Sequence, residues 1–349
     1  MEVAVLIVLA LNCGSSSLKF GLYEAAANRA MAIYQGEAEE IGSASAALPN
    51  HEAALGYALD ELRKRDLPHA EAVGHRFVHG GPKLTAHTLF DADVMKDLQM
   101  AVEYAPLHMP SALAVLKAME RETPRLPQVV CLDTAFHRTM PDVSRTYALP
   151  EAVRKLGVQR YGFHGLSLES ILDQLESVPE RLIAAHLGNG ASVTAICNGK
   201  SIDTTMGLTP TGGVMMGTRC GDLDPGISVF LLRHGYPSAE QLEDLFDHKS
   251  GLLGVSGVSS DVRELENLHA DFTLRMFCYQ VRKAIAAMTA ALGGVDLLVF
   301  TGGIGEHADS LRREIVDGLK FLKMEVRVIR SEEDVQIAKN TARLLNPQA

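Results

Sequence analysis

The chain has 349 residues, of which 47% are apolar and 22% charged, and its formal net charge is −10 at pH 7. This composition is typical of a soluble globular protein, and the negative charge disfavours both a nucleic-acid backbone and an anionic membrane surface as the main partner. Because a single core rarely holds more than about 250–300 residues, we expect two domains.

The first predicted element is an apolar run of strand length at Val3–Leu11. An export signal is the alternative, but residues 1–3 carry no positive charge, and Asn12 stands where a cleavage site needs a small residue. The chain has five cysteines without C-x-x-C spacing, which indicates neither a disulfide framework nor a zinc site. We therefore predict a buried first strand in a cytoplasmic protein.

The segment after this strand, Leu11–Phe20 (LNCGSSSLKF), is rich in small hydrogen-bonding residues, and an alternating strand follows at 18–24. Glycines allow close approach of the backbone to a ligand, and hydroxyl and amide groups add donors, so a phosphate cradle is predicted. It is not a P-loop, because the G-x-x-x-x-G-K-[ST] spacing is absent and a strand follows. A polar hairpin turn is the alternative interpretation.

Helical and strand patterns continue along the chain. The longest predicted helix, at 272–292, carries Arg275, Arg282 and Lys283 at interior positions and is therefore predicted to be a core helix, not a membrane span. The other predicted elements are helices at 51–66, 110–122, 164–178 and 261–269 and strands at 128–136 and 181–190.

Two segments share one design. VLALNCGSSSLKFGLY and LIAAHLGNGASVTAIC each consist of an apolar strand, then Asn12 or His186, then a glycine and small residues, then another strand, and their offset is 174 residues. A third strand, in DLLVFTGGIGEHAD, ends in glycines and enters a helix. Duplicated α/β halves with glycine-rich strand ends predict a cleft between two domains, whereas chance similarity of glycine-rich turns is the alternative.

Two arginines stand among glycines and small residues, Arg76 in GHRFVHGG and Arg219 in MMGTRCGDLDPG. A guanidinium in such a setting can bind phosphate or carboxylate oxygens with two parallel hydrogen bonds, although loose surface pairing is the alternative for each alone. Asp133, His137 and His164 stand at predicted strand or loop ends beside aromatic residues. Together these groups favour phosphoryl transfer from a nucleotide.

The whole set of segments resembles the acetate kinase family, within the actin, Hsp70 and sugar-kinase superfamily. The resemblance runs from Val3 to about Leu345 and keeps the family order of motifs: NCGSSSLKF, HRFVHGG, DTAFH, YGFHG, HLGNGAS, GKSIDTTMG, MMGTRCGDLDP, SGLLGVSGVSSDVREL and FTGGIGE. It implies an α/β fold of duplicated actin-like ATPase (ribonuclease H-like) domains with an interdomain cleft. The expected domains are 1–135 and 136–334, with a C-terminal helix at 335–349 packed back on the first. A homodimer is also implied.

The resemblance implies that Arg76 and Arg219 grip the acyl phosphate and that His164 stabilises the transferring phosphoryl group. Asp133 matches the residue that is usually named as catalytic acid or base. A short carboxylic acid has a pKa of about 4, so it is ionised at neutral pH and needs no base to attack phosphorus. We therefore expect Asp133 to orient an arginine or a histidine.

The resemblance also assigns the metal and nucleotide sites. Asn12 and Glu333 match a magnesium site, with Mn²⁺ as the alternative ion, and one amide and one carboxylate suffice because Mg²⁺ keeps several waters. Glu333 also reads as the capped first turn of a helix. Residues matching the ATP or ADP segments are Ser15, Ser17, Lys19, His186, Leu187, Gly188, Asn189, Gly190, Asp261, Val262, Arg263, Gly303, Ile304, Gly305, Glu306 and His307.

An apolar pocket for the acyl group is implied at Val78, Leu107, Phe163 and Pro210, with His108 beside it. The chain departs from the family pattern at Thr211, Gly212, Leu166, Leu168, Met109 and His307. One methylene in an apolar pocket gives about 1–3 kcal/mol of discrimination, so propionate stays an alternative to acetate.

The predicted function is reversible, magnesium-dependent phosphoryl transfer from ATP to acetate by direct in-line displacement. Alternatives on the same fold are a phosphoanhydride hydrolase, a sugar kinase with Asp133 as base, and an actin- or Hsp70-like nucleotide switch with a protein partner. A sugar would need several hydrogen-bonding side chains, and a switch needs neither a second arginine nor an apolar pocket, so the acyl kinase is favoured.

Overall fold

A computed structural model describes residues 5–42 and 48–346. The chain divides into two compact units, which are treated separately: unit 1 is Met1–Arg138, His164–Ser170 and Glu332–Ala349, and unit 2 is Thr139–Phe163 and Ile171–Ser331. The segment His164–Ser170, expected in the second domain, lies in unit 1. The physical reason is local: the Gly165 amide donates to the Asp133 carbonyl (3.0 Å), and Leu166 is buried in the core of unit 1.

Unit 1 is built on a mixed sheet whose described strands follow the order β3-β2-β1-β4-β6-β5. Strands β1, β2 and β3 form an antiparallel meander, whereas β4 and β6 run parallel to β1. Parallel strands end at the same edge of a sheet, so the residues that end β1, β4 and β6 lie at one edge. The bounds are β1 (Leu6–Cys13), β2 (Leu18–Ala26), β3 (Arg29–Ala38), β4 (Ala72–Phe77), β5 (Thr88–Leu89) and β6 (Gln128–Leu132).

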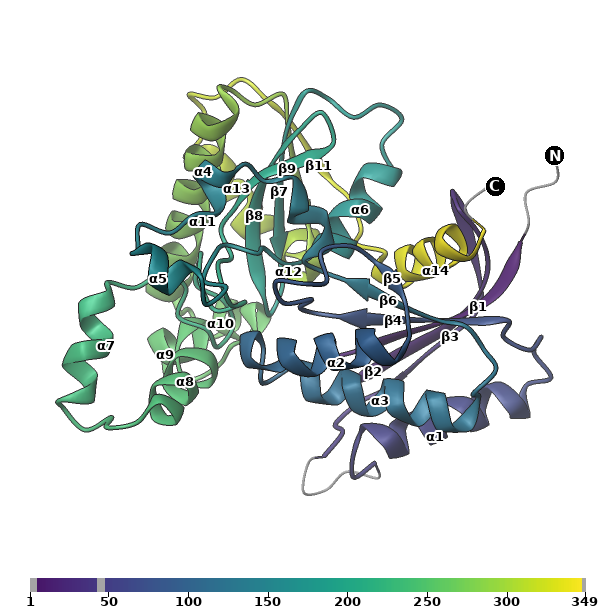
Figure 1. Cartoon of the computed structure of the whole chain (residues 1–349). Helices are drawn as coiled ribbons and strands as arrows, with labels where there is room; N and C mark the ends of the chain where they lie inside the picture. The colour runs from purple at the N-terminus through teal and green to yellow at the C-terminus, as the bar shows by residue number, and fades with distance from the viewer. Residues whose placement is uncertain (1–4, 43–47, 347–349) are drawn as a thin grey trace. The chain divides into compact units, whose positions relative to one another are not determined.

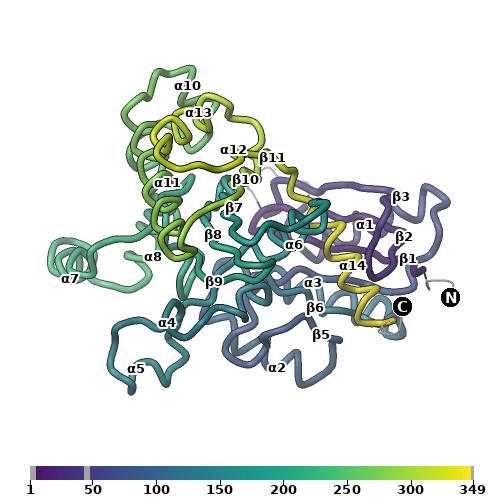
Figure 2. Tube along the Cα trace, turned by 90° about the horizontal axis from the view of Figure 1, so that it is seen from above, coloured from purple at the N-terminus to yellow at the C-terminus, as the bar shows by residue number. Residues whose placement is uncertain are grey.

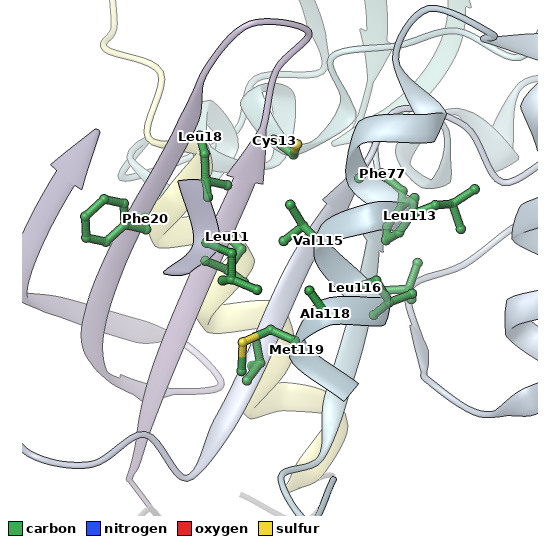
Figure 3. Close-up of a cluster of buried hydrophobic side chains, with 14 of the residues drawn as sticks. Leu11, Cys13, Leu18, Phe20, Phe77, Leu113, Val115, Leu116, Ala118 and Met119 are labelled. Carbon is green, nitrogen blue, oxygen red and sulfur yellow. The ribbon is translucent and has the colours of Figure 1, made fainter. Parts of the chain in front are cut away.

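Helices cover both faces of this sheet (Figure 1). One core, shown in Figure 3, lies where α3 packs against the strands, and it contains Leu116 and Met119 of α3 together with Leu11 of β1. The other core joins the sheet to the C-terminal helix α14 through Ile337 and Ala342, and Figure 2 shows that helix along the strands. The helices are α1 (His51–Lys64), α2 (Ala92–Met100), α3 (Met109–Glu122), the start of α6 (Gly165–Asp173) and α14 (Glu333–Leu345), with 3₁₀ turns at Ala101–Tyr104 and Ala135–Thr139.

Unit 2 repeats the plan of unit 1. Its described strands follow the order β11-β10-β7-β8-β9, in which β7, β8 and β9 form an antiparallel meander and β10 and β11 run parallel to β7. Asn12 and His186 are each the penultimate residue of the first strand of their sheet, which confirms the predicted internal repeat. The bounds are β7 (Arg181–Leu187), β8 (Ala191–Cys197), β9 (Lys200–Thr204), β10 (Leu297–Thr301) and β11 (Glu325–Val328).

The long helix α11 packs on β7, β8 and β9 of unit 2 and buries Phe277, Val281 and Ile285, which confirms the predicted core helix. Among the residues that the structure describes, none of the helices is both long and apolar enough to cross a bilayer. The helices wholly or partly in unit 2 are α4 (Asp142–Arg145), α5 (Glu151–Arg154), the end of α6, α7 (Pro225–Leu232), α8 (Ala239–His248), α9 (Gly251–Ser256), α10 (Val262–Asn267), α11 (Asp271–Leu292), α12 (Gly302–His307) and α13 (Asp309–Asp317).

Some predicted bounds differ from the structure. Strand β1 continues through Cys13, two residues beyond the predicted end, because Asn12 and Cys13 still pair with Lys19 and Leu18 of β2. The start of the predicted run, residues 3 and 4, lies outside the described residues. The helix predicted at 164–178 ends at Asp173, and the polar segment after it forms no further turn of α-helix.

Candidate active site

The centre of the candidate site in unit 1 is a buried ion pair between Arg76 on β4 and Asp133 directly after β6. Nη2 of Arg76 donates to Oδ2 of Asp133 at 2.7 Å, and Nε lies 3.2 Å from both carboxylate oxygens. The Asp133 side chain is 1% exposed and that of Arg76 18%. The β4–β6 register places Arg76 beside Cys131, so the parallel strands bring the two charged groups to one edge.

The remaining nitrogen of this guanidinium faces Asn12 and Glu333. Nη1 of Arg76 donates to Oδ1 of Asn12 at 2.9 Å and lies 3.0 Å from Oε2 of Glu333. Nδ2 of Asn12 in turn donates to Glu333 (3.2 Å) and to Asp334 (2.8 Å). The predicted metal-site pair Asn12 and Glu333 is thus assembled, together with Asp334, which sequence reasoning missed although it stands next to Glu333 in the acidic SEED segment.

The electrostatics of this group follow from burial beside one strong cation. Burial lowers the pKa of Arg76, but the charges of Asp133, Glu333 and Asp334 outweigh it and raise that pKa above the usual arginine value. Burial raises the pKa of Asp133, and the Arg76 guanidinium opposes that rise. Burial and the neighbouring Glu333 charge raise the pKa of Asp334, against the hydrogen bond from Asn12. Arg76 is therefore a permanently charged group held by acids.

His164 precedes helix α6 and is tied to Asp133 through the next residue. It has a φ of 63°, a left-handed conformation that is uncommon for a residue other than glycine, and its side chain is 9% exposed. The adjacent Gly165 passes so close to Asp133 that a Cβ would overlap the Asp133 carbonyl oxygen. The glycine therefore allows the backbone before α6 to lie against the end of β6.

The other predicted residues of unit 1 surround this centre less tightly. Ser15 and Lys19 are exposed in and after the β1–β2 turn, Ser17 is half-buried, and the turn is closed by a bond from the Gly14 amide to the Ser17 carbonyl (2.9 Å). Lys19 lies 3.9 Å from Glu37. Of the predicted pocket residues, Val78, Leu107 and His108 belong to unit 1 and are half-buried.

The predicted pocket residues Phe163 and Pro210 belong to unit 2, as does Arg219. Nη1 of Arg219 donates to the Pro210 carbonyl at 3.2 Å, so the structure brings these two predicted residues together. Burial lowers the pKa of Arg219, and the charge of Asp247 opposes that shift. Phe163 is buried, at 1% exposure.

The glycine-rich strand ends of unit 2 open onto a cavity of about 480 Å³. Gly188 and Asn189 after β7, Gly303 on α12 and Asp261 before α10 all line it, so three segments far apart in sequence meet there. Val262, Arg263, Ile304 and His307 also line the cavity, as do Ser260, Glu266 and Ala308, which sequence reasoning did not single out. His186, Leu187 and Gly305 are buried beside these segments.

The cavity wall is held by local hydrogen bonds. Asp261 caps α10 by accepting from the Arg263 amide at 2.7 Å, and the hydrogen bond from the Arg263 side chain lowers the pKa of Asp261 to about 2. The Gly188 amide donates to the Gly190 carbonyl at 2.9 Å, which closes the turn after β7. This backbone geometry suits close approach of a ligand to the glycine turns.

Glu306 has a structural role that its motif does not reveal. Its carboxylate accepts from the Gly302 amide (3.0 Å) and the Ser331 amide (2.9 Å). It thereby fixes the glycine turn after β10 to the segment that leads toward Glu333. A different cavity of unit 2, about 620 Å³ in volume, is lined by Arg160, Asp203 and Lys283 among others and contains none of the predicted site residues.

The donor set in unit 1 suits a magnesium ion in its chemistry. Asn12, Glu333 and Asp334 offer amide and carboxylate oxygens, which are the ligands that Mg²⁺ prefers. Among the described residues, no cluster of three or more His, Cys, Asp or Glu side chains forms a metal cage.

Two mixed sheets of the same strand order define the actin-like ATPase fold. A buried arginine lies at the strand ends of one sheet, and glycine turns lie at the strand ends of the other. The chain is 40% identical over 360 residues to an acetate kinase of Parabacteroides distasonis, covering 93% of this chain and 90% of that protein. It superimposes on the crystal structure of Porphyromonas gingivalis acetate kinase with a TM-score of 0.85 at 35% identity, covering 97% of this chain and 99% of that one.

A propionate kinase from Francisella tularensis is equally similar in structure, with a TM-score of 0.87, 33% identity and coverage of 97% of this chain and 99% of that chain. The family model of the acetokinase family matches residues 7–343. The chain belongs to the acetokinase family.

Proposed function

We propose that this protein is an acetate kinase that reversibly transfers the γ-phosphoryl group of ATP to acetate, giving acetyl phosphate and ADP. Membership of the acetokinase family supports the reaction class. The observation that carries the proposal is the Arg76 guanidinium, which Asp133 binds through two nitrogens at a sheet edge where Asn12 and Glu333 also lie. These contacts hold the guanidinium in one orientation, and a cation oriented in this way suits recognition of a carboxylate or an acyl phosphate.

Each charged residue then has a defined task. Arg76 and Arg219 bind oxygens of acetate and of the transferring phosphoryl group, and His164 donates a hydrogen bond to the charge that spreads over those oxygens. Asp133 holds Arg76 in position. Acetate is ionised at neutral pH, so its carboxylate oxygen attacks the γ-phosphorus in line, while the bond to the ADP oxygen breaks and no proton moves.

The nucleotide and the metal complete the proposal. ATP or ADP binds at the 480 Å³ cavity of unit 2, with its phosphates against the turns at Gly188 and Gly303. Asn12, Glu333 and Asp334 hold Mg²⁺, with Mn²⁺ as the alternative ion. When bound, this ion neutralises negative charge on the phosphates.

We also propose that the protein works as a homodimer in the cytoplasm. Helix α7 supports an interface: it has no buried residue, and Ile227, Val229, Phe230 and Leu232 are each at least 38% exposed. These four side chains point in different directions around α7, and a helix that is exposed and apolar on all sides is typical of an interaction surface. The cysteines, all of which lie within the described residues, are free thiols, which suits a reducing compartment.

Propionate is the alternative acyl substrate. Two of the departures from the family pattern, Leu166 and Leu168, are fully buried, with Leu166 in the core of unit 1. Thr211 beside Pro210 instead donates to Asp247, near the Arg219 segment. The similarity to a propionate kinase agrees with a pocket that admits a further methylene.

The test is to incubate the protein with ATP, magnesium and acetate, propionate or butyrate, and to trap acyl phosphate with hydroxylamine. We expect acyl hydroxamate with acetate at a rate at least equal to that with propionate. A folded, ADP-binding protein that forms no acyl hydroxamate with any of the three acids would favour a hydrolase or a nucleotide switch. Release of inorganic phosphate without acid would identify the hydrolase.

A further inference from the structure

A second hydrogen-bonded group in unit 1, the Glu169 cluster, consists of His87, Glu169, Gln336 and Asn340. The Glu169 carboxylate lies 3.0 Å from Nε2 of His87 and accepts from Nδ2 of Asn340 at 2.8 Å and from Nε2 of Gln336 at 3.2 Å. Gln336 and Asn340 are 1% exposed, and the side chains of His87 and Glu169 are 15% and 20% exposed. One carboxylate therefore receives three donors.

The backbone fixes the tautomer of His87. The Leu132 amide donates to Nδ1 of His87 at 3.0 Å, so Nδ1 carries a lone pair and the ring proton is on Nε2, which donates to Glu169. Nδ2 of Asn340, which lies 3.0 Å from Nε2 of His87, donates its hydrogen bond to Glu169. Burial raises the pKa of Glu169, but the hydrogen bonds from His87, Asn340 and Gln336 outweigh it, so that pKa is lowered and the carboxylate is ionised.

Each element that enters the cluster also carries a residue of the candidate active site. Leu132, held by the His87 ring, immediately precedes Asp133. Gln336 and Asn340 lie on α14, whose first residue is Glu333. Glu169 lies on α6, which begins directly after His164. The edge strand β5 begins at Thr88 and is too short to pair with Leu132 of β6. Nδ1 of His87 therefore accepts from the Leu132 amide in place of a strand carbonyl.

We propose that Glu169 and His87 are positioning residues for phosphoryl transfer, because together they fix the ends of β6 and α14 that present Asp133 and Glu333 to Arg76. This inference rests on the proposed function. Asp133 and Glu333 both contact the Arg76 guanidinium, at 2.7 and 3.0 Å, so a shift of either element changes the direction of the fork. A misplacement of about 1 Å at a reacting group can cost about 100-fold in rate.

The first arm of the test needs no activity. Histidine ¹⁵N NMR of the wild-type protein should show His87 as the neutral tautomer with an unprotonated Nδ1 and a protonated Nε2, assigned by loss of its signals in His87→Asn. In Glu169→Gln the Nε2 signal should shift, because the amide is a weaker acceptor than the carboxylate. A proton on Nδ1 in the wild-type protein would overturn the inference whatever the enzyme does.

The second arm measures kinetics of Glu169→Gln, His87→Ala and His87→Asn. The matched control is Glu61→Gln on α1, a carboxylate that pairs with Arg65 at the surface. We expect Glu169→Gln and His87→Ala to lower kcat by about 10- to 100-fold and to raise the KM for acetate. The KM for ATP should rise less than the KM for acetate, because the glycine turns of the nucleotide cavity belong to unit 2 and only the proposed metal ligand Glu333 is shared. In His87→Asn the side-chain oxygen can replace Nδ1 as acceptor, so kcat should recover part of that loss.

The outcomes separate three ideas. A purely structural role would lower kcat in proportion to the folded fraction and leave both KM values unchanged, and this would overturn the inference. Full activity of folded Glu169→Gln, equal to that of Glu61→Gln, would overturn it as well. A folded wild-type protein without acyl phosphate formation would instead refute the proposed function, and the tautomer measurement would still report on the geometry of the cluster.

Discussion

Replacing Asp133 by asparagine tests the central ion pair of unit 1. The substitution keeps the size of the side chain but removes the charge that Arg76 binds through Nη2 at 2.7 Å. The amide oxygen can still accept from Arg76, but the amide NH₂ group is a donor and would face the guanidinium in place of the other carboxylate oxygen. The guanidinium then keeps its contacts with Asn12 and Glu333 but loses the negative charge and one of the two acceptors at the end of β6.

The size of the effect follows from burial. Breaking a buried ion pair by removing one partner costs about 3–5 kcal/mol, and the remaining Glu333 contact favours the lower end, about 3 kcal/mol. For a unit of this size, each kcal/mol shifts the melting temperature by roughly 2–4 °C, so unit 1 should melt roughly 6–12 °C lower. Turnover should fall by about 100-fold because the substrate-binding fork is misdirected.

The assay is acyl hydroxamate formation from ATP and acetate across the pH range in which the protein stays folded, with thermal melting alongside. The control is Asp97→Asn, whose carboxylate pairs with Lys83 at 2.8 Å nearer the surface. We expect the pH–rate profile of Asp133→Asn to keep its shape, because acetate needs no base. A variant whose only change is a displaced pH profile would show that Asp133 transfers protons, and wild-type turnover would refute the role of the pair altogether.

Three further predictions concern pH, packing and the metal. Burial lowers the pKa of His75 from 6.5 to about 4, against the effect of the hydrogen bond that its Nε2 donates to Oε1 of Gln128, so the unfolded state gains protons first as the pH falls. The unfolding free energy from urea titrations should therefore drop by about 3 kcal/mol between pH 6.5 and pH 4. If the unfolding free energy of a His75→Gln variant drops by the same amount over this range, protonation of His75 is not the cause. Gly165→Ala should destabilise unit 1 by about 1–3 kcal/mol in thermal melts, because the new Cβ overlaps the Asp133 carbonyl oxygen. Gly56→Ala in α1 should instead stabilise the unit, because the space around its Cβ is open. Equal shifts of the melting temperature in the two variants would refute the packing argument. Removal of divalent ions by a chelator should abolish acyl phosphate formation and added Mg²⁺ or Mn²⁺ should restore it, whereas unchanged activity in the chelator would exclude the metal.

The duplication could be predicted from sequence because each copy is a local pattern. An apolar strand, one polar residue, a glycine turn and an alternating strand are all visible within sixteen residues, and the structure places Asn12 and His186 at equivalent strand positions. The glycine strand end at 302–305 was predictable for the same reason. Such patterns reflect backbone requirements of a turn, which depend on neighbouring residues and not on distant ones.

The partners of buried polar groups could not be predicted in this way. Glu169 is 82 residues from His87 and 171 from Asn340, and no spacing rule relates them. Asp334 was visible in the acidic SEED segment, but its contact with Asn12 depends on α14 returning to the first sheet. The placement of 164–170 in unit 1 likewise depends on distant partners: the Gly165 amide bonds to Asp133, Leu166 is buried in the core of unit 1, and Glu169 bonds to His87 and Asn340.

Under the proposed function, one strand plan serves a different chemistry in each unit. In unit 1 the parallel strand ends carry Arg76 and Asp133, so this edge is specialised in fixed charge. In unit 2 the equivalent edge carries Gly302, which has a φ of 76°. A Cβ atom at this position would lie only 2.8 Å from the carbonyl oxygen of Leu187, so there is no room for a side chain. A fixed positive charge suits the binding of a small carboxylate or phosphate anion. A backbone without side chains lets nucleotide phosphates approach its N–H groups closely. The Gly302→Arg substitution should therefore abolish ADP binding, measured by calorimetric titration, without creating a second anion site. Retained ADP affinity would refute this assignment of charge to unit 1 and bare backbone to unit 2.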